Sequence, residues 1–455
     1  MPVRDRRAGE ERGGRQTVKL ADEVRCILDR LAGAGFRAWV VGGAVRDWLG
    51  GREPADWDVA TDARPEEVLA LFPGARTDGA EFGRVLVGDV DVVTLRRDGV
   101  YRDARRPSTV EFTASLEEDL ARRDFTINAM AWAPEGGLVD PYGGREDLRA
   151  GVIRAVGDAR RRMHEDALRV LRALRFQAQL GFSIDPALQG AMREFGPRLS
   201  LVARERVAQE LEKLLLGPHA GMALRSMRDL GLVGEVIPPL VPCVDYDQST
   251  PHHLHDLYEH TVRVVEGVPA ERRLRLAALL HDCGKPLCRT IGPDGVAHYY
   301  GHAKAGAKIA GAYLRAMRFP ERVVGDVYLL IRRHMTQYYP ETQVTAMRRL
   351  VGRLGPELAR ALVTLKRADA LGRVGFVPPG IELMQRHLEE VLLRKDPVTE
   401  KDLALDGHAI MAILGIGPGP AVGQAKRFLL EAVREDPSLN TPEALAALLR
   451  ERAVV

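Results

Sequence analysis

Asp56 and Asp58, separated by one tryptophan, are the first residues of the chain whose types and spacing could do chemistry. In a strand, side chains two residues apart point to the same face, so both carboxylates would lie together. Two negative charges that close repel each other unless a cation lies between them, which favours a divalent metal site. Asp91 lies in a predicted neighbouring strand that could bring it beside the pair. Three acids of this kind are what two-metal nucleotidyl transfer requires.

A glycine pair, Gly42 and Gly43, lies between a predicted strand and a short predicted helix that carries Arg46. Glycines at such a turn let backbone N–H groups approach an anion, and the guanidinium of Arg46 could bind a phosphate. A simple tight turn would use the same two residues. The pair therefore indicates a phosphate site only in combination with the acids.

Residues 164–180 begin with acids and continue with arginines at every third position: Glu165, Asp166, Arg169, Arg172 and Arg175. Read as one helix, Glu165 and Arg169 would form an i,i+4 ion pair worth about 0.2–0.5 kcal/mol. The surrounding residues 145–206 contain 13 arginines, no lysine and 8 acidic residues, a net charge of +5 in a chain whose total is +3. Arginine suits planar recognition of phosphates or bases, although a solvated, salt-bridged helix face would have a similar composition.

Residues 252–370 hold a second set of metal-ligating residue types: His260, His281, Asp282, His302, His334 and Asp369. Imidazole and carboxylate ligands from several helices can bind one or two divalent transition metals, with a bound water as nucleophile. A helical scaffold that keeps these residues without turnover is the alternative.

Two kinds of scaffold must position these residues. Between about 20 and 150, short apolar runs predict strands at 37–41 and 57–60, a hairpin over 84–95 that turns at Gly88 and Asp89, and helices at 65–72 and around 116–130. After Gly151, apolar residues recur at helical spacing and strands nearly vanish. Proline-rich breaks at 238–251 and 373–380 predict module boundaries. The fold class is therefore α+β, a mixed head followed by a helical body.

Composition narrows the class of protein. A chain of 455 residues with 45% hydrophobic and 28% charged residues is typical of a globular protein of several domains, and excludes a disordered or membrane protein. No apolar run approaches the ~18 residues that cross a bilayer, and the polar N-terminal residues do not contain the apolar segment of a signal peptide. We therefore expect a cytoplasmic protein without a membrane partner. The four cysteines form no C-x-x-C pair, which argues against a disulfide framework or a zinc ribbon.

Six motifs follow one another along the chain: GGAVRD, DWD, DGVYRDARRPSTVEF, RRDFTINAM, DPYGG and HEDALRVLRALRF. In this order they resemble bacterial class II tRNA nucleotidyltransferases, the CCA-adding enzymes, over about 36–215. A later segment, DGHAIMAILGIGPGPAVGQ, is similar to the tail of those enzymes. The H…HD…H…H…D order resembles the HD phosphohydrolase superfamily. The resemblance implies a flexible basic tail (1–18), a polymerase-beta-like nucleotidyltransferase head (19–150), a helical neck (151–245), an HD-type body (246–375) and a helical tRNA-binding tail (376–455).

For the head, the resemblance implies that Asp56 and Asp58 bind Mg²⁺ and that Asp91 is the third acid. Contacts to the incoming nucleotide would come from Gly43, Arg46 and Arg123, and Asn128 would make a sugar or structural contact.

For the neck, the resemblance implies that Asp166 and Arg169 act as a protein template for the base. A carboxylate accepts from the amino group of C or A while arginine donates to the adjacent acceptor. U and G present a carbonyl there, which would leave Asp166 facing another acceptor. Arg172 and Arg175 would meet base or phosphate, and the HD residues would hold a divalent transition metal.

The predicted function is template-independent addition of CCA to the 3′ end of tRNA from CTP and ATP. Alternatives are a specialist that adds only A, and a bacterial poly(A) polymerase. The FGRV stretch at 82–85 is closer to the FGTV of the CCA type, although Arg84 departs from it. The loop motif DGVYRDARRP, usually missing from CC-only members, disfavours addition of CC alone. From other classes come an HD phosphohydrolase with an inert head and a tRNA-binding protein without activity, and the intact acids Asp56 and Asp58 argue against both.

Overall fold

The computed structural model describes residues 20–77, 83–98, 110–248, 255–293 and 295–453. The chain divides into two compact units. The first comprises Met1–Arg169 and Phe182–Met192, and the second comprises Val170–Gly181 and Arg193–Val455. Among the described residues, no helix combines the length and the apolar character needed to cross a bilayer.

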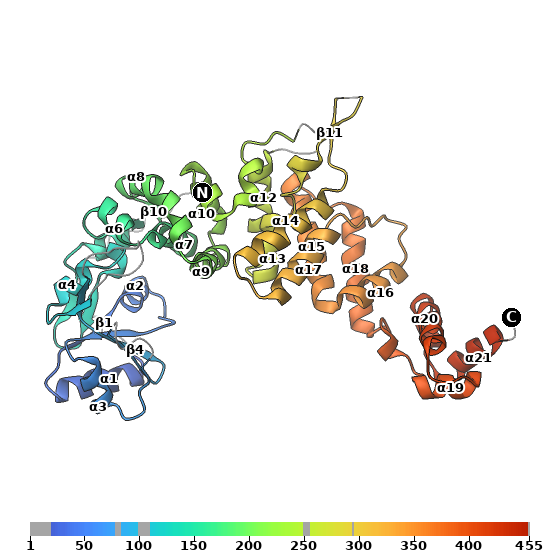
Figure 1. Ribbon diagram of the computed structural model, residues 1–455, viewed down its shortest axis with the longest axis horizontal. Helices are drawn as coiled ribbons and strands as arrows, with labels where there is room; N and C mark the ends of the chain where they lie inside the picture. Colours follow the sequence, from blue (N-terminus) through green and yellow to red (C-terminus); the bar gives the residue numbers. More distant parts are fainter. Residues whose placement is uncertain (1–19, 78–82, 99–109, 249–254, 294, 454–455) are drawn as a thin grey trace, which may run out of the picture. The chain divides into compact units, whose positions relative to one another are not determined.

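The first unit is built around a six-stranded mixed sheet with the order β3-β4-β2-β1-β7-β8 (Figure 1). The strands are β1 (Ala38–Val41), β2 (Asp58–Thr61), β3 (Arg84–Val87), β4 (Val90–Thr94), β7 (Ala131–Ala133) and β8 (Gly137–Val139). Neighbouring strands run antiparallel except β2 and β4, which are parallel. The predicted β3–β4 hairpin is present and turns at Gly88, whose φ is +59°.

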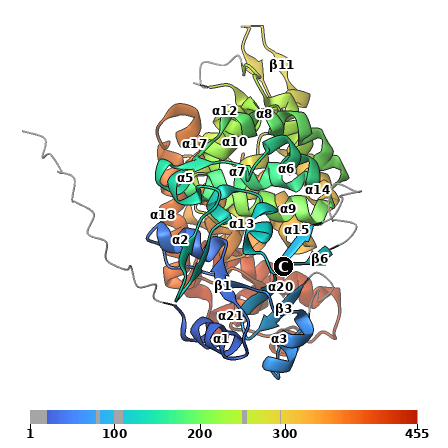
Figure 2. The same cartoon turned by 90° about the vertical axis from the view of Figure 1, so that its left-hand side faces the viewer.

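The two faces of the sheet pack against different helices. On one face, α1 (Asp22–Gly33) and α3 (Pro65–Leu71) cover side chains of β1 to β4, including Val40, Val59, Val85 and Val92. Figures 1 and 2 both place α1 and α3 together beside the sheet. On the other face, α4 (Leu116–Ala121) packs on a second cluster with Val41 and Ala60. Because strand side chains alternate, Asp58 and Asp91 lie on the face that α4 covers.

The remaining elements of the first unit are α2 (Gly43–Leu49), β5 (Arg96–Asp98), β6 (Val110–Phe112), a 3₁₀ turn (Thr126–Asn128), α5 (Gly144–Ala150), β9 (Val152–Ile153), α6 (Ala159–Glu165), α7 (Leu168–Leu180), β10 (Ser183–Ile184) and α8 (Pro186–Phe195). Of these, α7 passes into the second unit after Arg169, and α8 passes into it after Met192.

Three local predictions were wrong. The helix expected around 116–130 ends at Ala121, because the chain turns into an extended Phe125 that bridges to Ala155. The neck is not one helix, because Asp166 is extended (φ −141°, ψ 104°) and separates α6 from α7. Asp56 lies in a bend before β2, so it does not share a strand with Asp58.

The second unit is helical. Its long helices are α9 (Arg204–Leu215), α10 (Ala220–Asp229), α12 (Leu257–Gly267), α13 (Arg272–Leu280), α14 (His302–Ala316), α15 (Glu321–Arg333), α16 (Val344–Leu354), α17 (Pro356–Val374) and α18 (Pro379–Arg394). Helices α12 to α15 and α17 pack together (Figure 1). In the segment 347–371 apolar residues recur at helical spacing throughout, but the structure divides it into α16 and α17 at Gly355, where φ is +78°.

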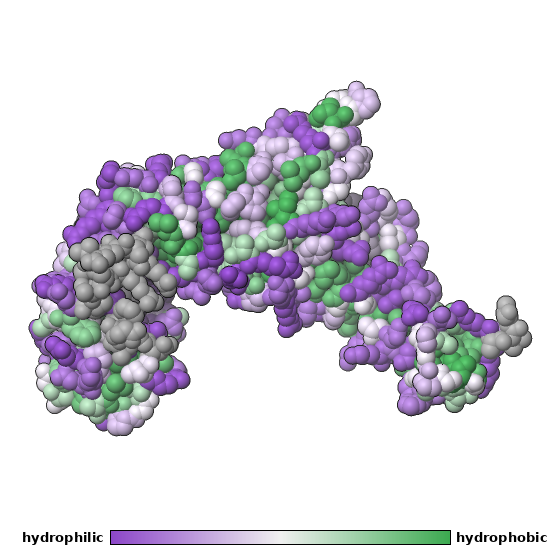
Figure 3. Space-filling view, in the orientation of Figure 1, coloured by the Kyte–Doolittle hydropathy of each residue, from purple (hydrophilic) through white to green (hydrophobic). Residues whose placement is uncertain are grey.

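The last three helices of this unit are α19 (Gly407–Leu414), α20 (Pro420–Glu435) and α21 (Pro442–Ala453). They share a small apolar cluster that includes Leu429 and Leu445. Green areas over these helices in Figure 3 show hydrophobic residues at their surface. Between α19 and α20, the segment 415–419 (GIGPG) begins with Gly415, which ends α19 in the left-handed region (φ +64°). This glycine-rich segment is therefore first of all a helix terminator.

Candidate functional site

The parallel pairing of β2 with β4 brings two acids of the head side by side. Asp58 and Asp91 are register partners. Burial raises the pKa of Asp58, and the negative charges of Asp91 and Asp56 raise it further, against lowering by Arg123 and Arg84. Repulsion of this kind is relieved by a divalent cation, and oxygen ligands are those that Mg²⁺ prefers. The donor set therefore fits the expected metal.

The three acids do not converge on one point in this conformation. Among the described residues, the groups of three or more ligand atoms within 4.8 Å of one another lie in the second unit, and none includes Asp56, Asp58 or Asp91. Asp91 is turned to Arg84, whose Nε and Nη2 donate to its two oxygens at 2.7 and 2.9 Å. The third acid thus lies beside the pair but is engaged by an arginine.

Gly42, at the turn between β1 and α2, lies against Arg123. Its backbone has φ +73° and ψ −129°, a conformation that favours glycine. A Cβ at Gly42 would lie 2.9 Å from Arg123 Nη1 and 3.7 Å from Asp58 Oδ2. Glycine therefore allows the guanidinium to approach the bare backbone beside Asp58. The sequence pointed to Gly43, but the close approach is at Gly42.

A buried carboxylate that sequence reasoning missed holds the arginine pair. Asp119 is 1% exposed, and its oxygens accept from Arg122 Nε at 2.9 Å and from Arg123 Nη2 at 3.1 Å. Burial raises the pKa of Asp119, but the two guanidinium charges outweigh it and hold that pKa below its ordinary value. The signal in the sequence was helical spacing, because both arginines follow Asp119 by three and four residues.

Arg46 connects the GGAVRD and RRDFTINAM motifs. It is buried, and its guanidinium donates from Nε to Asp47 Oδ1 at 2.9 Å and from Nη1 to Asn128 Oδ1 at 2.7 Å. Asn128 donates in turn to Asp124 Oδ1 at 3.1 Å. Asn128 therefore makes a structural contact between the motifs, and Arg46 is fixed by it.

Asp166 and Arg169 lie at the start of α7. Leu168 N donates to Asp166 Oδ1 at 3.0 Å and Arg169 N donates to Asp166 O at 3.0 Å, so Asp166 caps this helix. Arg169 is buried and donates to Glu165 Oε2 at 2.8 Å and to the carbonyl oxygens of Arg162 and Arg122. The Glu165–Arg169 ion pair predicted from spacing is present, and it orients the guanidinium.

The two later arginines of α7 differ in exposure. Arg175 pairs with Glu210 at 2.6 Å, packs 3.9 Å from the ring centre of Phe176 and has a side chain only 11% exposed. Arg172 is 34% exposed and lies 4.0 Å from Glu210. Arg172 is thus the more accessible of the two to a ligand.

The segment DGVYRDARRP cannot be placed beside these residues. Most of it, residues 99–107, lies outside the described part of the chain. The expectation drawn from it, that addition is not limited to CC, stays a prediction.

In the second unit, the six predicted ligands come together. His260, His281, Asp282 and Asp369 form one group and Asp282, His302 and His334 form another, with the ligand atoms of each group within 4.8 Å of one another. Asp282 belongs to both: its Oδ2 faces His260 and His281 at 3.5 and 3.2 Å, and its Oδ1 faces His302 and His334 at 3.4 and 3.6 Å.

Hydrogen bonds fix the orientation of three of the imidazoles. The Nδ1 atoms of His281, His302 and His334 lie 2.7–2.8 Å from backbone carbonyl oxygens. A carbonyl only accepts, so Nδ1 carries a proton, and in the neutral ring Nε2 faces the cluster with a lone pair. This is the arrangement that a metal-ligating histidine needs, and the mixed N/O donor set fits a divalent transition metal.

The cluster borders a cavity of about 220 Å³ that two further cations line. Lys285 Nζ lies 2.8 Å from Asp282 Oδ2 and donates to Gln248 Oε1 at 2.8 Å. Arg373 lines the same cavity, and within the described part of the chain its buried Nε has no hydrogen-bond partner. Neither cation was predicted from the sequence. Lys285 follows Asp282 by three residues and Arg373 follows Asp369 by four, so each lies about one helical turn after a predicted ligand.

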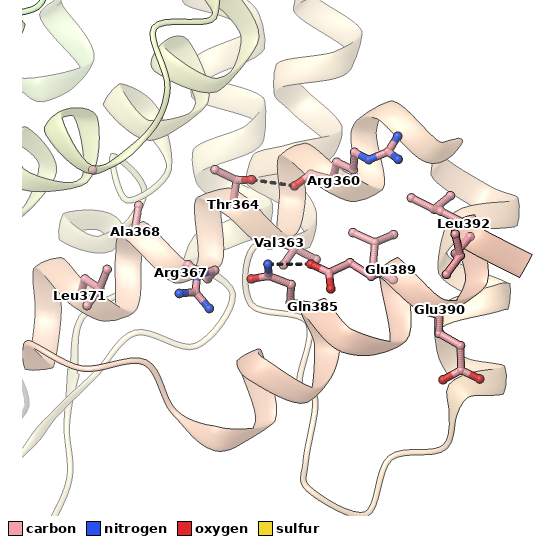
Figure 4. Close-up of a pocket in the computed structure, with 13 residues that line it drawn as sticks. Arg360, Val363, Thr364, Arg367, Ala368, Leu371, Gln385, Glu389, Glu390 and Leu392 are labelled. Atoms are coloured by element: carbon pink, nitrogen blue, oxygen red, sulfur yellow. Dashed lines mark hydrogen bonds between the residues drawn. The ribbon is translucent and has the colours of Figure 1, made fainter.

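A larger pocket, of about 840 Å³, lies between α17 and α18 (Figure 4). Two of its polar side chains bond within their own helices, since Thr364 donates to the Arg360 carbonyl and Gln385 donates to Glu389. The rest of its lining combines apolar residues with the charged Arg367 and Glu390. None of its lining residues is one of the six predicted metal ligands. We therefore assign no chemistry to this pocket.

Three family models match the chain in succession. The poly A polymerase head domain matches residues 38–154, the probable RNA and SrmB-binding site of polymerase A matches 181–243, and the HD domain matches 253–373.

Full-length relatives and a solved structure agree with these matches. A CC-adding tRNA nucleotidyltransferase of Thermus thermophilus is 40% identical over 90% of this chain and 93% of its own length. A CCA-adding enzyme of Geobacillus stearothermophilus is 34% identical over 94% and 96%. The crystal structure of the Bacillus stearothermophilus CCA-adding enzyme in complex with CTP matches with a TM-score of 0.72 and 31% identity, over 94% of this chain and 96% of that one. With a relative at 40% identity along nearly its whole length and the acids, glycine turn and arginines of the head in place, the chain belongs to the family of CC- and CCA-adding tRNA nucleotidyltransferases.

Proposed function

We propose that this chain adds CCA to the 3′ end of tRNA, using CTP and ATP as substrates and no nucleic-acid template. The observation that carries the proposal is the relation to CC- and CCA-adding enzymes over at least 90% of both chains. The Asp58–Asp91 register, with Arg123 beside it, supplies the groups that such a reaction needs.

Asp56 and Asp58 would hold Mg²⁺, with Asp91 as the third acid. When bound, Mg²⁺ supplies a Lewis acid that stabilises the charge developing on the transferred phosphate. Arg123 lies close to Asp58 and would contact the nucleotide, while Asp119 keeps its guanidinium oriented. Arg46 would position the triphosphate side of the site, since Asn128 fixes it against the same motif.

We propose that Asp166 and Arg169 select the base. A template must present its donor and acceptor in a fixed orientation, and both residues are held at the first turn of α7. An amino group beside an acceptor, as in C and A, would match this pair. A carbonyl in place of the amino group, as in U and G, would leave an acceptor unpaired at a cost of about 1–3 kcal/mol.

The experiment that tests the extent of addition uses three tRNA transcripts, which end before CC, after CC and at the full CCA. Each is incubated with the purified chain and each NTP. Addition of CC to the first and A to the second supports the proposal. Growth of the first transcript by CC alone would place this chain with its CC-adding relative, addition of A alone would identify an A-adding specialist, and long A tracts would identify a poly(A) polymerase.

A second candidate function rests on the ligand groups around Asp282. We propose that the HD site binds one or two divalent transition metals and hydrolyses phosphoesters. The histidine orientation, the shared aspartate and the cations Lys285 and Arg373 at the cavity support binding of an anionic phosphate near metals.

The test of the second function is hydrolysis of p-nitrophenyl phosphate and bis-p-nitrophenyl phosphate with added Mn²⁺, Co²⁺ or Ni²⁺. The variant His281→Ala should lose any activity. The matched control is His387→Ala, a histidine of the same unit that bonds to Tyr338 outside both ligand groups. Equal activity in the two variants would mean that the hydrolysis does not use this site.

A further inference from the structure

Arg84 occupies a place in the head where the family type has threonine in FGTV. On β3 it is the register partner of Val93, two residues from Asp91, so Arg84 and Asp91 are diagonal neighbours on one face of the hairpin. Its planar guanidinium donates to both carboxylate oxygens of Asp91, at 2.7 and 2.9 Å. This two-point pair is the strongest geometry available to an arginine and a carboxylate.

The Arg84–Asp91 ion pair lies next to the other acids of the head. Asp91 faces Asp58 in register, and Arg84 is close enough to Asp58 to lower the pKa of that carboxyl. Arg84 thus adds a second fixed positive charge to that of Arg123, on the side of the site that Asp91 forms.

A metal ligand needs an oxygen lone pair pointed at the ion. Arg84 binds both oxygens of Asp91, and the acids of the head do not gather within 4.8 Å of one another among the described residues. An ion that uses the lone pairs facing Arg84 must displace a guanidinium nitrogen, and an ion that uses the remaining lone pairs must lie close to a fixed positive charge. Either way, the contact with Arg84 subtracts from the free energy of metal binding at Asp91.

We propose that Arg84 competes with Mg²⁺ for Asp91 and thereby sets the metal affinity of the three-acid site. Arg84 is a positioning residue, since it acts through Asp91. The inference rests on the proposed metal role of Asp56 and Asp58.

The test measures Mn²⁺ binding to the full-length chain by the electron paramagnetic resonance signal of the free ion. Asp282→Ala is present throughout to remove one shared ligand of the HD site. The contribution of the head is the binding that Asp58→Ala abolishes. Arg84→Thr should tighten this contribution about two- to fivefold, since it removes a half-exposed ion pair from Asp91. Arg84→Lys should fall between Arg84→Thr and the parent, because lysine keeps the charge without the two-point geometry.

Two controls separate this inference from other effects. Arg37→Thr removes the same charge from an exposed pair with Asp62 at the far end of β2, and it should leave Mn²⁺ affinity unchanged. Arg84→Thr should also have no effect in an Asp91→Asn background. Equal affinities in Arg84→Thr and Arg37→Thr, weaker binding in Arg84→Thr, or an undiminished effect without the Asp91 carboxylate would each overturn the inference. If Asp58→Ala itself leaves Mn²⁺ binding intact, the proposed metal role of the acids is wrong.

Discussion

Asp119 is the buried carboxylate that holds two arginines of the head in place. It pairs with both Arg122 and Arg123, and Arg123 is the arginine whose charge lowers the pKa of Asp58 most. This single carboxylate therefore compensates the charge of Arg122 and orients the guanidinium of Arg123. Removing one partner of a buried ion pair leaves an uncompensated charge, which costs more than the pair contributes.

We expect Asp119→Asn to lower the free energy of unfolding of the head by about 3 kcal/mol at pH 7. Because the folded pKa of Asp119 lies below its ordinary value of 3.8, its contribution is present above pH 3.8 and is lost as the pH falls through the folded pKa. Urea unfolding followed by tryptophan fluorescence measures this, since all four tryptophans (Trp39, Trp48, Trp57, Trp132) lie in the first unit.

The control for this effect is Glu111→Gln, which removes a carboxylate from an exposed pair with Arg97. It should change stability by less than about 1 kcal/mol. A difference between Asp119→Asn and the parent that stays constant from pH 7 to below pH 3.8 would contradict the electrostatic explanation.

Asp58→Ala should lower the rate of nucleotide addition about 10³-fold or more, since metal ions supply several kcal/mol of transition-state stabilisation. Asp56→Ala should act in the same direction. Binding of tRNA should be largely preserved in both. Single-turnover incorporation of CTP and a filter-binding assay measure the two effects, with Asp89→Ala, an exposed acid of the hairpin turn, as the control. A parent-like rate in either variant would remove these acids from the chemistry.

At the scale of elements, the pieces of the head that could be predicted are those with local signals. Alternating apolar residues and the Gly88 turn predicted the β3–β4 hairpin, and Pro65 predicted the start of α3. The family order of motifs, rather than periodicity, indicated the polymerase-like head. The parallel pairing of β2 with β4 has no local signal, and it is this pairing that sets Asp91 beside Asp58.

A hydrogen bond from the backbone to a side chain explains a helix boundary that the apolar periodicity did not predict. The apolar spacing of 164–180 fits one helix, but the side chain of Asp166 bonds to the backbone and begins a new helix instead. In the same way, spacing identified the six HD ligands as residue types but could not show that the two oxygens of Asp282 face different histidine pairs. Such pairings depend on tertiary packing of four helices.

The cap and the template functions of Asp166 can be separated. Asp166→Ala removes the cap of α7 and should destabilise the head by about 1 kcal/mol, whereas Asp166→Ser keeps a capping oxygen and should cost less. If Asp166 reads the base, both variants should lose C and A incorporation and discriminate less against U and G. Incorporation of all four NTPs into tRNA lacking CCA measures this. Uniform loss of rate with unchanged rejection of U and G would make Asp166 a cap only.

At the scale of the whole molecule, the two sites belong to different compact units. The acids of the head lie in the first unit and the HD ligands in the second. Effects of mutations in two sites that share no partner residue are expected to add independently.

Asp282→Ala should therefore abolish hydrolysis of phosphoesters while CCA addition stays within about twofold of the parent. Both assays are run on the same preparation, and circular dichroism checks folding. Parallel loss of both activities in a folded variant would show that the sites are coupled.

Binding of tRNA should weaken as salt is added, because an enzyme that serves every tRNA has to bind phosphates and shape rather than sequence. Affinity measured between 50 and 200 mM salt tests this. Residues 145–206, with their net charge of +5, are the expected source of the effect. Affinity that does not change with salt would contradict the model.

Gly42 limits how this chain can change over evolutionary time. Any side chain there would meet Arg123 Nη1 at 2.9 Å and would also have to adopt a backbone conformation that glycine alone tolerates well. A second mutation that shortens Arg123 could relieve the collision but not the backbone strain. A lineage that lost Gly42 would have no single compensating substitution elsewhere, and its direct way back would be reversion to glycine.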